Sequence, residues 1–480
     1  MKHFGKMIFG AAMIASLAAC TNETDFGQES AGQVEEGIPT YARITLNVNQ
    51  MGSRAPQNTT PSLDFEKDLQ GGVRIFVFDK NGVLEADQTF TEQQLTDDPT
   101  SAGHKKTAVI ATKTGLKTIY AIANPGLLGA NDLPKNLGDF KNYKFTAVTQ
   151  GAPGEKPEVK VAEVNKFFMT GFKEETLTKS DKTNPVNVKI NVTRLAAKAA
   201  LALKDGANQT GANFKPVKTA VTASDAKFQL VQMNKESKIY VAEGEFSPMG
   251  SKAEQATAKP KTGVLTYAHL TTQDWQRSTI VDAWTNALAT SDFTTATTKE
   301  KFAYTSENIN ESPEVGNVTF AMIQMKLKPT KFSSEEGTFD TATGTFFAVV
   351  QYAGAGTTKA DQIIAYHGIY KDEATANKAK QNLTDAGTTN CEIIKYENGI
   401  SYYRLNLRDK AIENNIINRY AVKRNHYFKI TVDAINNPGV NKAEDLFPNT
   451  PVTPVEEDAF IDATIEVDDW IDVDMTESLG

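Results

Sequence analysis

A cysteine close to the start of the chain has the neighbours expected of a lipid attachment site. A short basic start precedes an apolar stretch, residues 7–19, which ends in the run Leu-Ala-Ala-Cys at residues 17–20. The stretch is too short to cross the ~30 Å hydrocarbon core of a bilayer but suits an export signal. We predict a signal peptide over residues 1–19 and a lipid such as palmitate on Cys20. The alternative is a plain export signal with a chance cysteine.

The other side chains that could catalyse a reaction form no pattern typical of an enzyme. His104, His269, His367 and His426 are isolated from one another, and no HExxH, GxSxG or phosphate-binding glycine loop occurs. The acidic run at residues 472–476 lacks the glycine and the closing glutamate of a calcium loop. We therefore expect no enzyme, no metal and no cofactor.

Composition places the chain among ordinary globular proteins and excludes two classes. Its 480 residues suggest about three domains, or two large β-rich ones. A net charge of −8 argues against nucleic acid as a partner. Once Cys20 carries lipid, Cys391 is the one thiol left, so no intramolecular disulfide can form. Apolar neighbours predict that Cys391 is buried.

Most of the chain has the apolar patterns of β-strands. Residues 41–49 alternate, with Ile44, Leu46 and Val48 on one face, whereas residues 73–78 are almost continuously apolar and suit a strand buried on both faces. Many short strands separated by polar turns favour β-sandwiches. Further predicted strands are residues 117–123, 186–192, 227–232, 239–241, 318–327, 346–352, 401–407 and 427–432.

Helices are expected to be few and short. Residues 372–383, rich in Ala, Lys and Gln, are the best candidate, and the Ala-rich residues 194–203 suit either a helix or a buried strand. The composition changes at residues 204–211. We therefore predict an N-terminal β-sandwich over residues 55–205 and a C-terminal one over residues 206–435.

The C-terminal segment alternates over an unusual length. In residues 461–475, apolar and acidic or polar positions alternate, exchanged only at residues 469–470. At about 3.3 Å per residue the segment spans about 50 Å, whereas ordinary strands span about 17–20 Å. It therefore forms two strands kinked at 469–470, or one strand that serves two sheets. Its apolar positions are Ile461, Ala463, Ile465, Val467, Ile471, Val473 and Met475.

A linker with four prolines, residues 436–458, precedes this segment. Semi-extended at about 3.1 Å per residue, its residues 439–458 reach roughly 60 Å, more than the roughly 40 Å diameter of a 150-residue domain. The strand within residues 459–480 could thus leave its own domain. The alternative is that this strand folds back into a sheet of its own domain.

The loop after the first strand offers a way to remove that strand. Residues 50–60 are polar and small and contain one basic residue, Arg54. Proteases cut exposed loops, so a cut between Arg54 and Ala55 would release residues 41–49. A foreign strand could then fill the groove by β-augmentation, and head-to-tail exchange of this kind builds an open filament. The residues spaced to replace the lost side chains are Ile461, Ala463, Ile465 and Val467.

Short motifs in a fixed order carry a family resemblance. They are residues 17–20, 51–55, 119–125, 167–171, 194–198, 304–308, 424–430 and the strand around 469–470. The sequence resembles the fimbrillins of Bacteroidales, the shaft subunits of type V pili. The minor-fimbrium branch is the better match, and the major-fimbrium shaft subunits are the nearest alternative.

This resemblance implies a path from export to assembly. Such subunits have two transthyretin-like β-sandwich domains, reach the outer membrane as lipoproteins, and are trimmed by an arginine-specific protease, here at Arg54–Ala55. The lipidated propeptide, residues 20–54, is lost, and the C-terminal strand of one subunit fills the groove of the next identical subunit. Accessory tip and anchor proteins complete the surface fimbrium, which mediates adhesion and biofilm formation. Lys67 and Arg74 are fallback cleavage sites.

Charge adds one expectation, and a second class of function stays open. Residues 455–480 contain acidic but no basic residues, so the groove that receives them should be flanked by lysines, for which Lys113, Lys117 and Lys198 are candidates. The alternative function is an outer-membrane lipoprotein that binds glycans or host proteins without polymerising. That alternative predicts that lipid and residues 20–54 persist.

Overall fold

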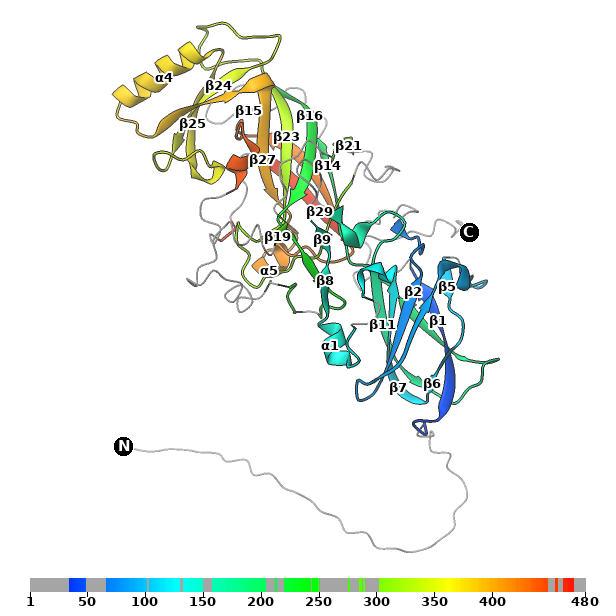
Figure 1. Ribbon diagram of the computed structural model, residues 1–480. Coiled ribbons are helices and arrows are strands. Elements are labelled where there is room, and N and C mark those ends of the chain that lie inside the picture. Colours follow the sequence, from blue (N-terminus) through cyan, green and yellow to red (C-terminus); the bar gives the residue numbers. More distant parts are fainter. Residues whose placement is uncertain are drawn as a thin grey trace, which may run out of the picture.

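The apolar runs fold into sheets that stack along an elongated molecule, shown in the computed structural model in Figure 1. The first strands lie at one end and the longest helix lies at the other. The structure describes residues 34–48, 66–101, 103–129, 133–149, 158–203, 212–213, 220–242, 244–248, 250, 275–276, 285–286, 288–289, 302–447, 454–455 and 461–469.

The N-terminal half contains two five-stranded sheets. One has the order β12-β1-β5-β4, with β6 also pairing with β1, and the other has the order β13-β11-β7-β2-β3. The strands are β1 (Pro39–Asn47), β2 (Val73–Asp79), β3 (Leu84–Phe90), β4 (Thr96–Asp97), β5 (His104–Lys106), β6 (Ile110–Lys113), β7 (Gly115–Ala123), β11 (Met169–Leu177), β12 (Val186–Asn191) and β13 (Thr193–Arg194).

One hydrophobic cluster fills the space between these two sheets. Ile44 and Leu46 of β1 meet Ile75 of β2 and Ile190 of β12 there. Strand β2 is buried on both faces, as predicted, because its alternate side chains Phe76 and Phe78 enter a second cluster on the far side. The predicted mainly β, sandwich-type fold is thereby confirmed for this half.

The C-terminal half has two further five-stranded sheets. Their orders are β21-β14-β28-β29, with β22 on β14, and β15-β16-β23-β27, with β20 on β16. The strands are β14 (Ala197–Leu203), β15 (Ala212–Asn213), β16 (Ala220–Val231), β20 (Thr285–Asn286), β21 (Leu288–Ala289), β22 (Ala303–Thr305), β23 (Phe320–Pro329), β27 (Ile400–Asn406), β28 (His426–Ile435) and β29 (Ile461–Asp469).

The Ala-rich run that suited helix or strand is the strand β14. It lies parallel to β28, and its small side chains are fully buried, so the run packs tightly inside the C-terminal half. Strand pairing therefore passes from the first pair of sheets to the second between Arg194 and Ala197. Strand β14 already pairs with strands of the C-terminal half. The change of composition at residues 204–211 therefore lies after the point where the chain passes from one half to the other.

A third layer covers the end of the C-terminal half. The sheet β25-β24-β26 packs one face on the main core and carries helix α4 on the other. Cys391 is buried beneath α4, as predicted. Asp372 caps α4 by accepting a hydrogen bond from the Thr375 amide. The bounds are β24 (Phe346–Tyr352), β25 (Ile363–Tyr370), α4 (Glu373–Asp385) and β26 (Cys391–Tyr396).

The two halves share a core. A single hydrophobic cluster runs from Phe76 and Tyr120 in the N-terminal half to Phe228 and Ile430 in the C-terminal half. A small sheet of β8 and β18 also joins them. The remaining elements are α1 (Leu137–Lys141), β8 (Lys144–Thr146), β9 (Val148–Thr149), β10 (Glu158–Val159), β17 (Met233–Asn234), β18 (Glu236–Lys238), β19 (Trp275–Gln276), α5 (Ile416–Arg419), and the 3-10 turns Glu92–Gln94, Pro125–Leu127, Lys160–Ala162, Ala360–Gln362, Glu397–Gly399 and Ala443–Leu446.

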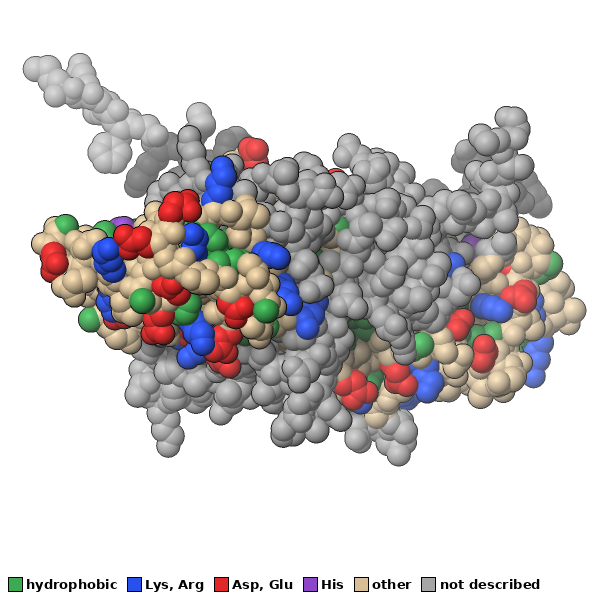
Figure 2. All heavy atoms as spheres, turned by 90° about the horizontal axis from the view of Figure 1, so that it is seen from above, with side chains coloured by type: hydrophobic (Ala, Val, Ile, Leu, Met, Phe, Trp, Pro, Cys, Tyr) green, Lys and Arg blue, Asp and Glu red, His purple; other side chains and the backbone are tan. Residues whose placement is uncertain are grey.

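Two surface properties bear on function. Within the described residues, no helix is long and apolar enough to cross a membrane. Figure 2 shows acidic and basic side chains intermixed over the described parts of one face, so neither sign gathers into a patch on that face.

Candidate functional site: the terminal strands and the junction of the two halves

Strand β1 lies inside its sheet and not at an edge. It runs parallel to β12 on one side and antiparallel to β5 and β6 on the other. The Ile44 amide donates to Thr107 Oγ1 at 3.1 Å, and the Thr107 amide donates back to the Ile44 carbonyl at 2.9 Å. Loss of β1 would therefore leave a groove with unpaired backbone on both walls.

The side chains predicted to fill this groove are buried. Ile44 and Leu46 are fully buried and Val48 is almost so. Burial of each such side chain contributes about 1.5–3 kcal/mol. The apolar face is buried as predicted, but Thr45 and Asn47 on the other face are buried too. Strand β1 is therefore not the half-buried strand that its alternation predicted.

Polar side chains fasten both ends of β1. Ser180 Oγ accepts from the Tyr41 amide at 3.1 Å and donates to the Tyr41 carbonyl at 2.7 Å, and Thr40 Oγ1 donates to the Thr178 carbonyl at 2.7 Å. At the other end, Asn47 Nδ2 donates to Asn191 Oδ1 at 3.1 Å.

Several predicted site residues lie outside the described residues, so their roles stay predictions. They are Cys20, Arg54, Ala55, Ile471, Val473 and Met475.

The C-terminal strand β29 lies in the sheet of its own chain. It pairs antiparallel with β28, from Ile461 opposite Ile435 to Asp469 opposite His426. Ala463 and Ile465 are buried there, and Val467 packs against the same core. Residues 461–469 thus follow the fold-back alternative.

The first part of the predicted linker is fixed to the C-terminal half. Tyr366 and Tyr396 both donate their hydroxyls to the Gly439 carbonyl, at 2.7 and 2.6 Å, and Tyr403 donates to the Asn437 carbonyl at 3.0 Å. Burial raises the pKa of all three phenols, so they stay protonated and donate.

Two contacts farther along shorten the free linker again. The chain at Ala443–Leu446 packs on Phe320 and Met322, and Val455 packs on Val318. The linker length estimated from the sequence is therefore too long, because residues early in the linker are bound to the C-terminal half. Composition alone does not show which side chains make these contacts.

The lysines suggested for the groove divide into two kinds. Lys117 is buried in an ion pair with Glu85 at 2.9 Å, and Lys198 is fully buried against Glu66, so neither can flank a groove for acidic residues. These two suggestions were wrong. Lys113 is exposed and lies opposite Pro39 of β1, so it keeps that role as a prediction.

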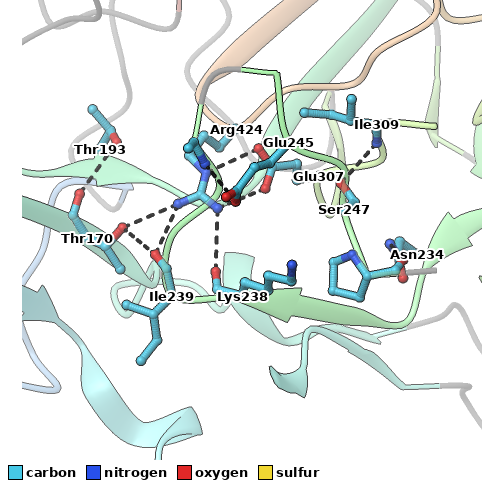
Figure 3. Close-up of polar contacts among 12 residues, drawn as sticks. Thr170, Thr193, Asn234, Lys238, Ile239, Glu245, Ser247, Glu307, Ile309 and Arg424 are labelled. Carbon is cyan, nitrogen blue, oxygen red and sulfur yellow. Dashed lines mark hydrogen bonds and ion pairs between the residues drawn. The ribbon is translucent and has the colours of Figure 1, made fainter. Parts of the chain in front are cut away.

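A polar cluster around Arg424 joins the two halves (Figure 3). Arg424 pairs with Glu307 through two hydrogen bonds, of 3.2 and 2.8 Å. Its guanidinium also donates to the Ile239 and Lys238 carbonyls and to Thr170 Oγ1 of β11. A cavity of about 620 Å³ opens beside it, bordered by Glu245, Phe246, Lys423, Asn425 and His426.

A second cluster at the junction centres on Glu66. Its Oε1 accepts from Lys198 Nζ at 2.9 Å and from the Tyr304 hydroxyl at 2.8 Å. Arg194 Nε donates to the Glu66 carbonyl at 3.0 Å. Burial, followed by the Glu66 carboxylate, raises the pKa of Tyr304, so its hydroxyl stays a donor.

Sequence reasoning did not assign these junction residues, although it contained the signal. Residues 167–171, 194–198, 304–308 and 424–430 carried the family resemblance without a stated role, and all four segments meet at the junction. Among the described residues, no group of His, Cys, Asp and Glu is arranged to hold a metal ion.

The fold and the strand arrangement define a two-part, sandwich-type β protein whose first described strand lies inside a sheet. Residues 394–476 match the family model described as major fimbrial subunit protein type IV, fimbrillin, C-terminal. The C-terminal part of the chain is thus similar in sequence to fimbrillins, and the minor-fimbrium branch stays a prediction. No curated protein matches.

Solved structures of fimbrial and cell adhesion proteins match this chain at low sequence identity. A fimbrilin from Porphyromonas gingivalis is 15% identical, with 90% of this chain and 99% of that chain covered and a TM-score of 0.41. A protein from Parabacteroides distasonis described as a cell adhesion protein is 13% identical, covering 90% and 100%, with a TM-score of 0.46. The C-terminally truncated tip fimbrial protein of Porphyromonas gingivalis is 12% identical, covering 90% and 100%, with a TM-score of 0.38.

Proposed function

We propose that this protein is a fimbrial subunit that polymerises when a strand from the next copy replaces β1. The position of β1 is the observation that carries the proposal. It is the first described strand of the chain and holds a central place in its sheet, so a single cut after it would disconnect it from everything downstream. The match of residues 394–476 to the fimbrillin C-terminal model supports the same class.

The donor is best assigned to the residues after Asp469. Residues 461–467 supply four of the seven predicted donor positions, but β29 already lies in its home sheet. Ile471, Val473 and Met475 follow with the same alternation and match the spacing of Ile44, Leu46 and Val48. Strand β29 would then stay in the sheet of its own chain and tether the donor. Of the two alternatives for this segment, the proposal takes the two strands kinked at residues 469–470.

The exchange would be driven by burial. A cut between Arg54 and Ala55 turns β1 into a separate peptide held by hydrogen bonds and by the buried apolar side chains of Ala42, Ile44, Leu46 and Val48. A donor that remains attached to a neighbouring subunit has a high local concentration and outcompetes a peptide that can diffuse away. Because each subunit would both give and receive, the assembly is open and grows head-to-tail.

The remaining parts of the proposal concern location and partners. The lipid on Cys20 would hold the precursor at the outer membrane until an arginine-specific protease removes residues 20–54. Identical subunits, with accessory tip and anchor proteins, would then form a surface fimbrium that supports adhesion and biofilm formation.

The test uses the full precursor, an arginine-specific protease and two variants. Arg54→Ala should leave an uncut monomer, and deletion of residues 470–480 should give a subunit that is cut but stays monomeric, both scored by size-exclusion chromatography. Lys67→Ala is the matched control and should polymerise like the parent. Normal polymerisation of either of the first two variants would refute the exchange. Persistence of lipid and residues 20–54 on surface protein would favour the non-polymerising lipoprotein.

A further inference from the structure

The chain immediately after the proposed cleavage loop is fixed at the junction of the two halves. Glu66 is fully buried, although it is the first described residue after that loop. Its carboxylate lies between Lys198 and Tyr304, and its carbonyl accepts from Arg194. We call these four residues the Glu66 anchor.

The surroundings of Lys198 make this ion pair costly to break. Lys198 Nζ lies 3.9 Å from the centre of the Phe302 ring and 5.2 Å from that of Tyr427, and its side chain has no exposed surface. In such an environment the charge is stabilised by Glu66 and by the aromatic faces in place of water. Removal of the carboxylate charge would leave a buried cation without its compensating anion.

The residues after Glu66 are held by the N-terminal half. Asn124 Nδ2 donates to the Asp68 carbonyl at 2.8 Å, and its Oδ1 accepts from the Gly71 amide at 2.9 Å. Asn124 adopts the left-handed conformation, with φ of 53°, which places its side chain against this segment. Residues 66–72 are thus held from both halves at once.

The anchor also borders the place where β29 ends. Arg194 Nη1 lies 3.5 Å from Asn425 Oδ1 while its Nε holds the Glu66 carbonyl. The next residue, His426, pairs with Asp469, the last described residue of β29. Glu66, the first described residue after the loop, and Asp469, the last described residue of β29, therefore both lie near this cluster.

We propose that the Glu66 anchor is the point at which release of the N-terminal segment stops after cleavage. This inference rests on the proposed function. The cut frees β1 and makes Ala55 the new N-terminus, and the buried ion pair at Glu66 prevents the release from extending to Asp68 and then to β2.

The test follows where trypsin, which cuts after Lys and Arg, stops on the full chain. The parent protein should be cut after Arg54 and then resist cleavage after Lys67, giving a product that starts at Ala55 by intact mass. Glu66→Gln should speed cleavage after Lys67 by more than about tenfold and give a product that starts at Asp68. The matched control is Glu163→Gln, which removes the carboxylate of an exposed ion pair and should change nothing.

Two readouts separate local release from general unfolding. Arg74 is almost buried and bonded to Asp87 within the sheet, so cleavage there requires β2 to open. Glu66→Gln should raise cleavage after Lys67 without an equal rise after Arg74, and the double variant Glu66→Gln, Lys198→Met should restore resistance in part. An equal rise at both sites, or no change at Lys67, would overturn the anchor.

Failure of the proposed function gives a different result. If the parent is not cut after Arg54, the exchange proposal fails, but the effect of Glu66→Gln on cleavage after Lys67 can still be scored in the uncut precursor.

Discussion

At the residue scale, one glycine is required by a close backbone approach between the two sheets of the N-terminal half. At Gly171 in β11, an added Cβ would lie 1.9 Å from the Asn191 carbonyl oxygen of β12, which is backbone and cannot turn aside. This position closes the motif at residues 167–171. The glycine is therefore required where the two sheets of the N-terminal half converge.

Gly171→Ala should destabilise the protein by about 1–3 kcal/mol or more, because the strands must separate to admit the methyl group. The free energy of unfolding in urea measures this. Gly126→Ala, where nothing lies within 4 Å of the added Cβ, is the control and should change stability by less than about 0.5 kcal/mol. Equal stability of the two variants would contradict the close approach.

At the scale of elements, the sequence pattern of a strand predicts which of its faces are buried. The alternation of β1 predicted the burial of Ile44 and Leu46 but not that of Thr45 and Asn47 on the other face. The continuous apolar run of β2 correctly predicted burial on both faces. The Ala-rich β14 was ambiguous because alanine favours helices yet also fits between crowded strands.

The partner of β29 and the packing of the linker could not be predicted in the same way. Alternation specifies which face of a strand is buried but not which sheet receives it, so pairing with β28 was left as one of two alternatives. The linker composition predicted an extended chain, whereas three distant tyrosines hold its first residues. Contacts between residues that lie far apart in the chain leave no recognisable pattern in a single sequence.

The tyrosine contacts to the linker give a prediction at this scale. The double variant Tyr366→Phe, Tyr396→Phe removes both donors to the buried Gly439 carbonyl and should cost about 1–3 kcal/mol in urea unfolding. Tyr120→Phe is the control, because the buried Tyr120 hydroxyl has no hydrogen-bond partner among the described residues, and it should be neutral or slightly stabilising. A double variant as stable as the parent would show that the linker is held by its apolar contacts alone.

At the scale of the whole molecule, the two halves form one mechanical unit. One hydrophobic cluster crosses the junction, and the Arg424 and Glu66 clusters tie the same surfaces together by charge. The order of the motifs in the sequence predicted the class of protein. That these motifs meet at the junction of the two halves could be seen only in the structure.

The central claim is that β1 is removed and replaced during assembly. Intact mass and N-terminal sequencing of the protein sheared from the cell surface test it most directly. The account predicts a chain that starts at Ala55, without lipid, within a ladder of oligomers. A lipidated monomer that starts at Cys20 would contradict it.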